Sequence, residues 1–276
     1  MQGNIDHATV KGFGEEWRMF DQSVLAEKEL RELFDQYFKI FPWQMLSEQA
    51  VGFDLGCGSG RWAKCVAPTV GRLHCIDASE EALVVAKRNL AAAPNCEFHR
   101  ASVDHLPLGD NSMDFGYALG VLHHVPNTAE GIQQCVKKLK PGAPFLLYLY
   151  YAFDNRPAWF RWLWYASDVA RKGIAASPFP IRYGITQAIA TLVYYPLARL
   201  SLVLETLGFT VGNVPLSAYR RRSFYTMRTD TLDRFGTRLE QRFTAEEIRQ
   251  MMEHAGLRRV VFSDSLPYWC ALGYKE

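Results

Sequence analysis

The sequence lacks the features that mark several common classes of protein. Its six cysteines form no C-x-x-C pair and no Cys/His cluster, so we expect neither a metal site nor a disulfide framework, and we predict reduced thiols. It also lacks a basic excess, because 31 Lys and Arg stand against 29 Asp and Glu, which disfavours a nucleic-acid partner. The polar segment 1–10 has no basic start or apolar centre, so we expect a cytoplasmic protein.

No stretch of about 20 uninterrupted apolar residues is present either. The most apolar segment, 185–207, is broken by Pro196, Arg199 and Glu205, so we do not expect a transmembrane span. Hydrophobic residues make up 49% of the 276 positions and charged residues 22%, which is typical of a folded globular protein. This length accommodates one domain with an added lid.

The most informative segment that is present is 51–62, which reads VGFDLGCGSGRW. An apolar run ends in Asp54, and Gly56, Gly58 and Gly60 follow at every second position. Glycines at this spacing let the chain turn sharply from a strand, adopt positive φ, and bring backbone N–H groups against a ligand. We therefore expect a ligand to lie flush against this turn.

The spacing of the turn separates two kinds of nucleotide site. A dinucleotide site requires G-x-G-x-x-G/A, whose third small residue would fall at Arg61, so a nicotinamide-dependent oxidoreductase is the weaker alternative. The pattern acid-x-G-x-G-x-G instead resembles motif I of the class I S-adenosylmethionine-dependent methyltransferases. That resemblance implies that the turn holds the methionine part of S-adenosylmethionine. The cofactor residues implied here are Asp54, Gly56, Cys57, Gly58 and Gly60.

The neighbouring segments agree with this interpretation. A second predicted strand, 72–76, ends in Asp77, about 20 residues after the first turn, where an acid accepts hydrogen bonds from a ribose diol. Ala78 and Ser79 then begin a helix with an apolar face, and Ala78 is included among the cofactor residues. An acid at this place could also serve only as a helix cap, but Ser79 is an equally suitable cap.

Residues 97–127 resemble the small-molecule branch of these methyltransferases, which contains the quinone-biosynthesis C-methyltransferases. Ser102 stands where many relatives have an Asp that contacts the adenine amino group, so Asp104 shares or takes that role. The resemblance also implies that the Val103 N–H faces an adenine ring nitrogen and that Leu119 contacts the cofactor.

Strands and helices alternate along the chain, with near-continuous apolar strands, which predicts an α/β fold with a parallel sheet covered on both faces. Ligands then bind outside the carboxyl ends of the strands. The resemblance implies a Rossmann-like seven-stranded sheet of order 3-2-1-4-5-7-6. We expect the cofactor-binding core at 46–151 and 236–276, with a helical insertion after strand 5 at 152–235 and an N-terminal helical segment, 1–45, closing over the cleft.

The insertion is too long to be a structureless loop, so it must have its own fold. It is rich in apolar and aromatic residues and could roof the active site, pair two subunits into a homodimer, or touch a bilayer surface, in that order of preference. Pro196 is predicted to kink or divide its second helix. In the N-terminal segment, Phe13 and Trp17 are candidate cleft residues.

The predicted reaction is transfer of a methyl group to a small-molecule oxygen, nitrogen or carbon, without a metal and with a hydrophobic or partly anionic acceptor. His123 and His124 are the candidate bases, although one of them is expected to be structural and an amine acceptor would need no base. A non-catalytic scaffold that binds the cofactor and uses the insertion as an interface is the other alternative. The candidate acceptor residues are Phe13, Trp17, Tyr150, Tyr219 and Arg221.

Overall fold

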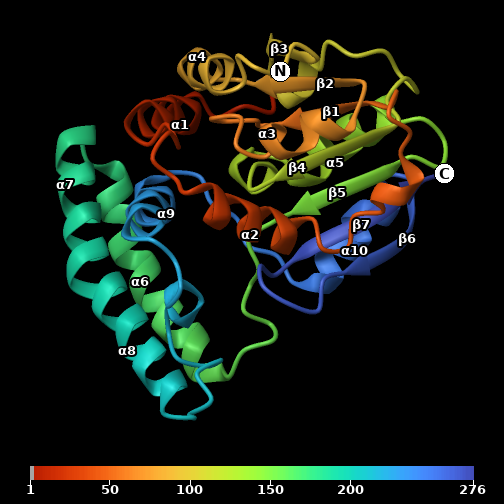
Figure 1. Ribbon diagram of the computed structural model, residues 1–276. Helices are drawn as coiled ribbons and strands as arrows, with labels where there is room; N and C mark the ends of the chain where they lie inside the picture. The colour runs from red at the N-terminus through yellow and green to blue at the C-terminus, as the bar shows by residue number, and fades with distance from the viewer. Residues whose placement is uncertain (1–2) are drawn as a thin grey trace. The chain divides into compact units, whose positions relative to one another are not determined.

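A computed structural model describes residues 3–276 (Figure 1). The chain divides into two compact units, each described here by itself. The first, the sheet unit, contains the chain up to Ser23, Leu30–Ala152 and Leu239–Glu276. The second, the helical unit, contains Val24–Glu29 and Phe153–Arg238. The helical unit thus combines Phe153–Arg238 with a short segment from the N-terminal part of the chain, and the domain bounds expected from the sequence stay a prediction.

A seven-stranded sheet of order β3-β2-β1-β4-β5-β7-β6 forms the centre of the sheet unit, which confirms the predicted topology (Figure 1). The first five strands are parallel, and β7 pairs antiparallel with both β5 and β6. The carboxyl ends of the first five strands therefore meet at one edge. The strands are β1 Val51–Leu55, β2 Arg72–Asp77, β3 Cys96–Arg100, β4 Phe115–Leu119, β5 Pro144–Tyr148, β6 Leu257–Phe262 and β7 Cys270–Lys275.

Helices cover the sheet and begin where the sequence provides caps. Ser79 accepts a hydrogen bond from the Ala82 N–H, and Thr244 and Glu247 form a reciprocal capping box. Helix α3 (Ala63–Val66) is short, and the 3-10 turn Ala67–Thr69, which contains Pro68, follows it directly. The helices are α1 His7–Met19, α2 Glu27–Tyr37, α3 Ala63–Val66, α4 Glu80–Asn89, α5 Thr128–Lys138 and α10 Ala245–His254.

The core of the sheet unit has two parts, one on each face of the sheet. On one face, strand residues such as Phe53 and Leu147 pack with Ile132 of α5 and Met252 of α10. On the other, an aromatic cluster includes the rings of Phe38 and Tyr117, 5.2 Å apart, and those of Phe41 and Phe115, 6.0 Å apart. The aromatic stripe that begins in α2 therefore lies against the sheet.

The helical unit has a small core of its own, formed by Tyr194, Ala198, Tyr219 and Met227. Its longest helical run, Phe179–Thr206, contains a π-helical turn, Ala190–Tyr194, which ends two residues before Pro196. Proline has no N–H to donate, and the widened turn lets the run continue through it. The helices are α6 Ala158–Ala176, α7 Phe179–Ile189, α8 Tyr195–Thr206 and α9 Phe224–Gly236 (Figure 1).

The Tyr219 hydroxyl stabilises this core. Tyr219 is buried, and its hydroxyl donates to Asp230 Oδ2 at 2.7 Å. We expect Tyr219→Phe to lower the free energy of unfolding by about 1–3 kcal/mol, because it removes the hydrogen bond of a buried hydroxyl to a half-buried carboxylate. Urea denaturation measures the change, and Tyr165→Phe, at a 55% exposed position, should cost almost nothing. Equal stability of the two variants would contradict this account of the hydrogen bond.

Candidate active site

The glycine turn follows β1 and has the positive φ angles that the sequence predicts. Gly56, Gly58 and Gly60 have φ values of +70°, +53° and +77°, which disfavour any side chain. The expected donation of N–H groups to a ligand needs correction. Both Gly56 N–H and Cys57 N–H donate to the Ile76 carbonyl, and Gly58 N–H donates to Asp77. The space that a Cβ would take at the three glycines is filled by the side chains of Val121, Trp17 and Leu90, respectively. The glycines therefore let these side chains pack closely on the turn.

Asp77 is fixed at the tip of β2 by two backbone donors. Its Oδ2 accepts from Gly58 N–H at 2.9 Å and its Oδ1 from Ser79 N–H at 2.8 Å. Burial raises the pKa of this carboxyl, and the backbone hydrogen bonds oppose that shift. Each carboxylate oxygen can accept a second hydrogen bond. Asp77 is therefore oriented by the protein and retains acceptor capacity for two hydroxyl groups.

Asp54 is the penultimate residue of β1, just before the glycine turn, and is 1% exposed. Burial raises its pKa to about 8, while the neighbouring Tyr117 hydroxyl acts in the opposite direction. Its Oδ2 has no hydrogen-bond partner within residues 3–276. The site thus contains a buried carboxyl that holds its proton at neutral pH.

The three residues expected at the adenine lie directly after β3. Ser102 precedes the 3-10 turn Val103–His105, and Asp104 Oδ2 accepts the backbone N–H of Asn4. The Asn4 side chain also exchanges two hydrogen bonds with the backbone of Asn127, each 2.7 Å long. Asn4 thus ties the N-terminal segment to this loop, which the sequence analysis missed because the segment has no motif. Asp104 Oδ1 is buried and has no partner in the described part of the chain.

Helix α1 contacts both the glycine turn and His124. The Trp17 ring lies against Gly58, where an added Cβ would come within 2.8 Å of it. One turn earlier, the Phe13 ring lies 4.9 Å from the His124 ring. The side chains of the two N-terminal candidates therefore border the glycine turn and the candidate base, respectively. Their roles in binding stay predictions.

The two histidines differ sharply in environment. His123 is fully buried and stacks on Tyr150 with ring centroids 3.9 Å apart, and burial holds its pKa well below the ordinary value. His124 Nδ1 lies 2.7 Å from the Leu239 carbonyl oxygen. Because a carbonyl can only accept, Nδ1 carries a proton, which leaves Nε2 as the only nitrogen that could take one up. His124 is therefore the better oriented of the two candidates, and its role as a base stays a prediction. His123 is a packed ring that burial keeps neutral.

Comparisons with known proteins decide the family. Residues 53–147 match the family model for a methyltransferase domain. The sequence is 31% identical over 108 residues to a probable S-adenosylmethionine-dependent methyltransferase of Mycolicibacterium smegmatis, covering 38% of this chain and 41% of that protein. It is 30% identical over 118 residues to a demethylmenaquinone methyltransferase of Staphylococcus aureus, covering 40% and 48%. Residues 53–147 are a class I S-adenosylmethionine-dependent methyltransferase domain.

The similarity has defined limits. The chain spans less than half the length of the curated relatives it matches. A solved complex between the Haloferax volcanii Trm112 methyltransferase activator and a putative methyltransferase contains a chain with a TM-score of 0.52 and 16% identity, covering 95% of this chain and 96% of that one. This likeness shows the methyltransferase fold. The family's cofactor is S-adenosylmethionine, and neither a nicotinamide-dependent oxidoreductase nor a scaffold is favoured.

The candidate residues are compatible with that cofactor, and its binding by them stays a prediction. Asp77 is oriented for a diol, beside the three positive-φ glycines. Ala78 follows Asp77 directly, and Leu119 ends β4, the strand beside β1. The Cys75 thiol acts to lower the pKa of Cys57, but burial and nearby carboxylates outweigh it and raise that pKa to about 11. The thiol thus stays protonated.

The remaining acceptor candidates have partners within their own units. Tyr150 is 7% exposed, and the Arg242 guanidinium lies 5.2 Å from its ring centre. In the helical unit, Tyr219 bonds to Asp230, and Arg221 forms an ion pair with Glu205 at 2.9 Å. An anionic acceptor at Arg221 would have to compete with this glutamate. Acceptor binding by these residues stays a prediction.

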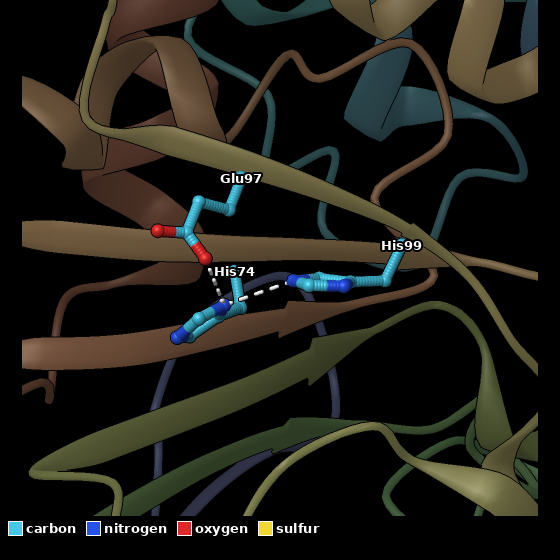
Figure 2. Close-up of side chains that lie close together, drawn as sticks. All are labelled: His74, Glu97 and His99. Carbon is cyan, nitrogen blue, oxygen red and sulfur yellow. Dashed lines mark hydrogen bonds and ion pairs between the residues drawn. The ribbon is translucent and has the colours of Figure 1, made fainter.

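A group of potential metal ligands lies elsewhere, on β2 and β3 (Figure 2). His74 Nδ1 is 3.0 Å from His99 Nε2 and 3.4 Å from Glu97 Oε2. Side chains three residues apart on a strand point to opposite faces, so His74 and Asp77 lie on opposite faces of β2. The sequence does not reveal this group, because 22 residues separate His74 from Glu97 and the three residues fit no ligand motif.

Replacement of His124 tests its role as a base. An Asn side-chain amide can still donate to the Leu239 carbonyl from the Nδ1 position but offers no basic nitrogen. For an oxygen or carbon acceptor we expect His124→Asn to lower turnover by about 10²- to 10⁴-fold with cofactor affinity unchanged. Single-turnover methyl transfer and calorimetry measure the two quantities. The control is His105→Asn, at an exposed position; unchanged turnover in His124→Asn would remove it as the base.

Proposed function

We propose that this chain transfers a methyl group from S-adenosylmethionine to a small-molecule acceptor without a metal ion. The observation that carries the proposal is the fixed Asp77 carboxylate beside the positive-φ glycine turn. This pair of features suits a ribose diol beside the turn. The family match supports the same cofactor and reaction class.

The cofactor would be held by side chains and backbone at the carboxyl ends of β1 to β4. Asp77 would accept the ribose hydroxyls, and Asp104 Oδ1 is an acceptor still available near the adenine. When bound, S-adenosylmethionine supplies an electrophilic methyl carbon on a sulfonium. The chain then has to place the acceptor atom behind that carbon and exclude water. Trp17 and Phe13 on α1 supply apolar surface for that exclusion.

The surroundings of His124 favour an acceptor with an apolar body. Phe13 and Tyr150 border its ring, with ring centroids 4.9 and 5.6 Å away. A neutral imidazole that donates through Nδ1 can take a proton at Nε2 from an oxygen or carbon acid. We infer a hydrophobic or partly anionic acceptor and a cytoplasmic location.

Two measurements test the proposed function. Calorimetry with S-adenosylmethionine and its demethylated product should give binding at one site per chain. Incubation with methyl-labelled cofactor and fractionated cell extract should place the label in the small-molecule or lipid fraction. Label in protein or nucleic acid would refute the acceptor class. Binding without any labelled product would favour a scaffold, and absence of binding would refute the function itself.

A further inference from the structure

The group His74, Glu97 and His99 brings three donor atoms together at the β2–β3 edge of the sheet. Their ligand atoms all lie within 4.8 Å of one another (Figure 2). His74 and Glu97 are direct partners in the parallel pairing, and His99 is two residues further along β3 on the same face. We propose that these side chains bind a divalent transition-metal ion such as Zn²⁺, for which two imidazoles and one carboxylate are a typical donor set.

The orientation of the side chains suits a metal ion. His74 is buried, and its Nδ1 lies 3.0 Å from His99 Nε2 and 3.4 Å from Glu97 Oε2. Glu97 Oε1 lies 3.2 Å from Arg72 Nε, while Oε2 faces His74. Arg72 therefore competes with an ion for Glu97 but leaves one oxygen turned toward the histidines. Because β3 ends the sheet, a bound ion would join the edge strand to its neighbour.

Variants at the group separate metal binding from a hydrogen-bonded histidine pair. Zinc titration of the purified chain should show one tight site and a raised melting temperature. We expect His74→Asn and His99→Asn each to weaken that site at least tenfold. Arg72→Gln should strengthen it, because the competing cation is removed from Glu97. The matched control is His105→Asn, at an exposed position outside the group.

The zinc titrations test the metal site independently of methyl transfer. Zinc binding that is equally tight in His74→Asn, His99→Asn and the unaltered chain would overturn the proposal, as would no binding to the unaltered chain. Cofactor binding should be unaffected by these variants, since His74 and Asp77 lie on opposite faces of β2. Failure of the proposed function would therefore leave this result intact.

A different observation concerns the helical run Phe179–Thr206, whose polarity is inverted. Half of its buried positions are polar or charged, whereas its outward positions are almost entirely apolar. The buried residues are Arg182, Thr186, Ala190, Tyr194, Ala198 and Ser201. A helix of a globular protein in water normally exposes its polar positions and buries its apolar ones. By length and composition the run could cross a membrane, and only 22% of its most apolar window is buried inside the protein. Its exposed apolar residues are Ile181, Ile185, Leu192, Val193, Tyr195, Leu200 and Val203.

Helix α6 presents the same kind of surface. Its exposed large side chains fall at helical spacing and are dominated by aromatic residues. Tryptophan and tyrosine are the residues that gather where a bilayer meets water. We call the exposed apolar side chains of α6 and of Phe179–Thr206 together the apolar face. The α6 members are Trp159, Trp162, Leu163, Tyr165 and Val169.

The charge of the helical unit indicates which surface the apolar face meets. This unit contains 13 Lys and Arg against 7 Asp and Glu, whereas the sheet unit contains 18 against 22. A basic unit with a wide aromatic and aliphatic face is complementary to an anionic lipid surface. We infer that the apolar face docks onto an anionic bilayer, with the helices lying on its surface.

The contacts of Phe179–Thr206 agree better with a position on the bilayer surface than with a transmembrane span. Within the helical unit α7 packs against α6 and α9. Arg199 donates to the carbonyls of Arg220 and Arg222 at 2.8 and 3.2 Å. A span would carry Arg182 and Arg199 into hydrocarbon, which is costly. Lying flat keeps both arginines on the protein side and exposes the apolar residues to lipid.

Vesicle sedimentation tests the docking. The chain should bind vesicles of phosphatidylcholine with 30% phosphatidylglycerol, bind pure phosphatidylcholine at least tenfold less, and be released by salt. Trp162→Ser and Leu192→Ser, at positions 73% and 74% exposed, should each weaken binding at least fivefold without loss of fold. Val84→Ser on α4, at a 59% exposed position, is the control.

A second copy of the chain is the competing occupant of the apolar face. Sedimentation velocity without lipid distinguishes it. A dimer that Trp162→Ser and Leu192→Ser dissociate, together with no binding to anionic vesicles, would overturn the docking proposal. Equal binding of the Trp162→Ser, Leu192→Ser and unaltered chains to anionic vesicles would also overturn it.

Discussion

Replacing Asp77 by alanine should weaken S-adenosylmethionine binding by roughly ten- to hundredfold. Hydrogen bonds to a charged group contribute about 1.5–3 kcal/mol, and each 1.4 kcal/mol is a factor of ten in affinity. The loss has two sources, because Asp77 also fixes the glycine turn through Gly58 N–H and the start of α4 through Ser79 N–H. The alanine removes both the ligand acceptor and the group that orients the turn.

Calorimetry on three variants separates these sources. Asp77→Asn keeps a side-chain oxygen for one backbone donor but loses the charge, so its affinity should fall between those of Asp77→Ala and the unaltered chain. Asp264→Ala removes an 84% exposed carboxylate and should bind normally. Thermal melting checks that each variant is folded. Normal affinity in a folded Asp77→Ala would exclude Asp77 from the cofactor site.

The order of the sheet could be predicted because it depends on patterns that the sequence displays directly. Apolar strands end in Asp54 and Asp77, and Ser79 and Thr244 mark helix starts by local chemistry. The role of the turn's N–H groups could not be predicted in the same way. The acceptors of Gly56 and Gly58 are the Ile76 carbonyl and Asp77, about 20 residues away, and only the folded register brings them there.

Other parts of the site depend on contacts between distant segments. The Leu239 carbonyl fixes the tautomer of His124 across 115 positions, and Asn4 reaches Asn127 across 123. Neither contact leaves a motif, because any residue can supply a carbonyl. The apolar composition of 185–207 similarly predicted a helix but not which face would be buried. The burial of Arg182 and Thr186 inside the helical unit emerges only from the packing of α7.

The stability of the protein should fall as pH rises through neutrality, and Asp54 is the cause. Its pKa is about 8 in the folded chain, against 3.8 for an ordinary aspartate. Below pH 3.8 both the folded and unfolded forms hold the proton. Between pH 3.8 and 8 the unfolded form releases it while the folded form keeps it, so the free energy of unfolding falls by up to about 1.4 kcal/mol per pH unit. Above pH 8 both forms are ionised and this dependence ends.

Asp54→Asn isolates this contribution, because asparagine resembles the protonated carboxyl and cannot ionise. Urea denaturation from pH 5 to pH 9 should show the variant gaining stability over the unaltered chain as pH rises, with the steepest gain between about pH 5 and 7 and a levelling above pH 8. S-adenosylmethionine carries positive charge, and its binding beside Asp54 favours the ionised carboxyl. Its affinity should therefore increase toward pH 8 in the unaltered chain and stay flat in Asp54→Asn. Parallel stability profiles for the two proteins would show that Asp54 is ionised in the fold at neutral pH.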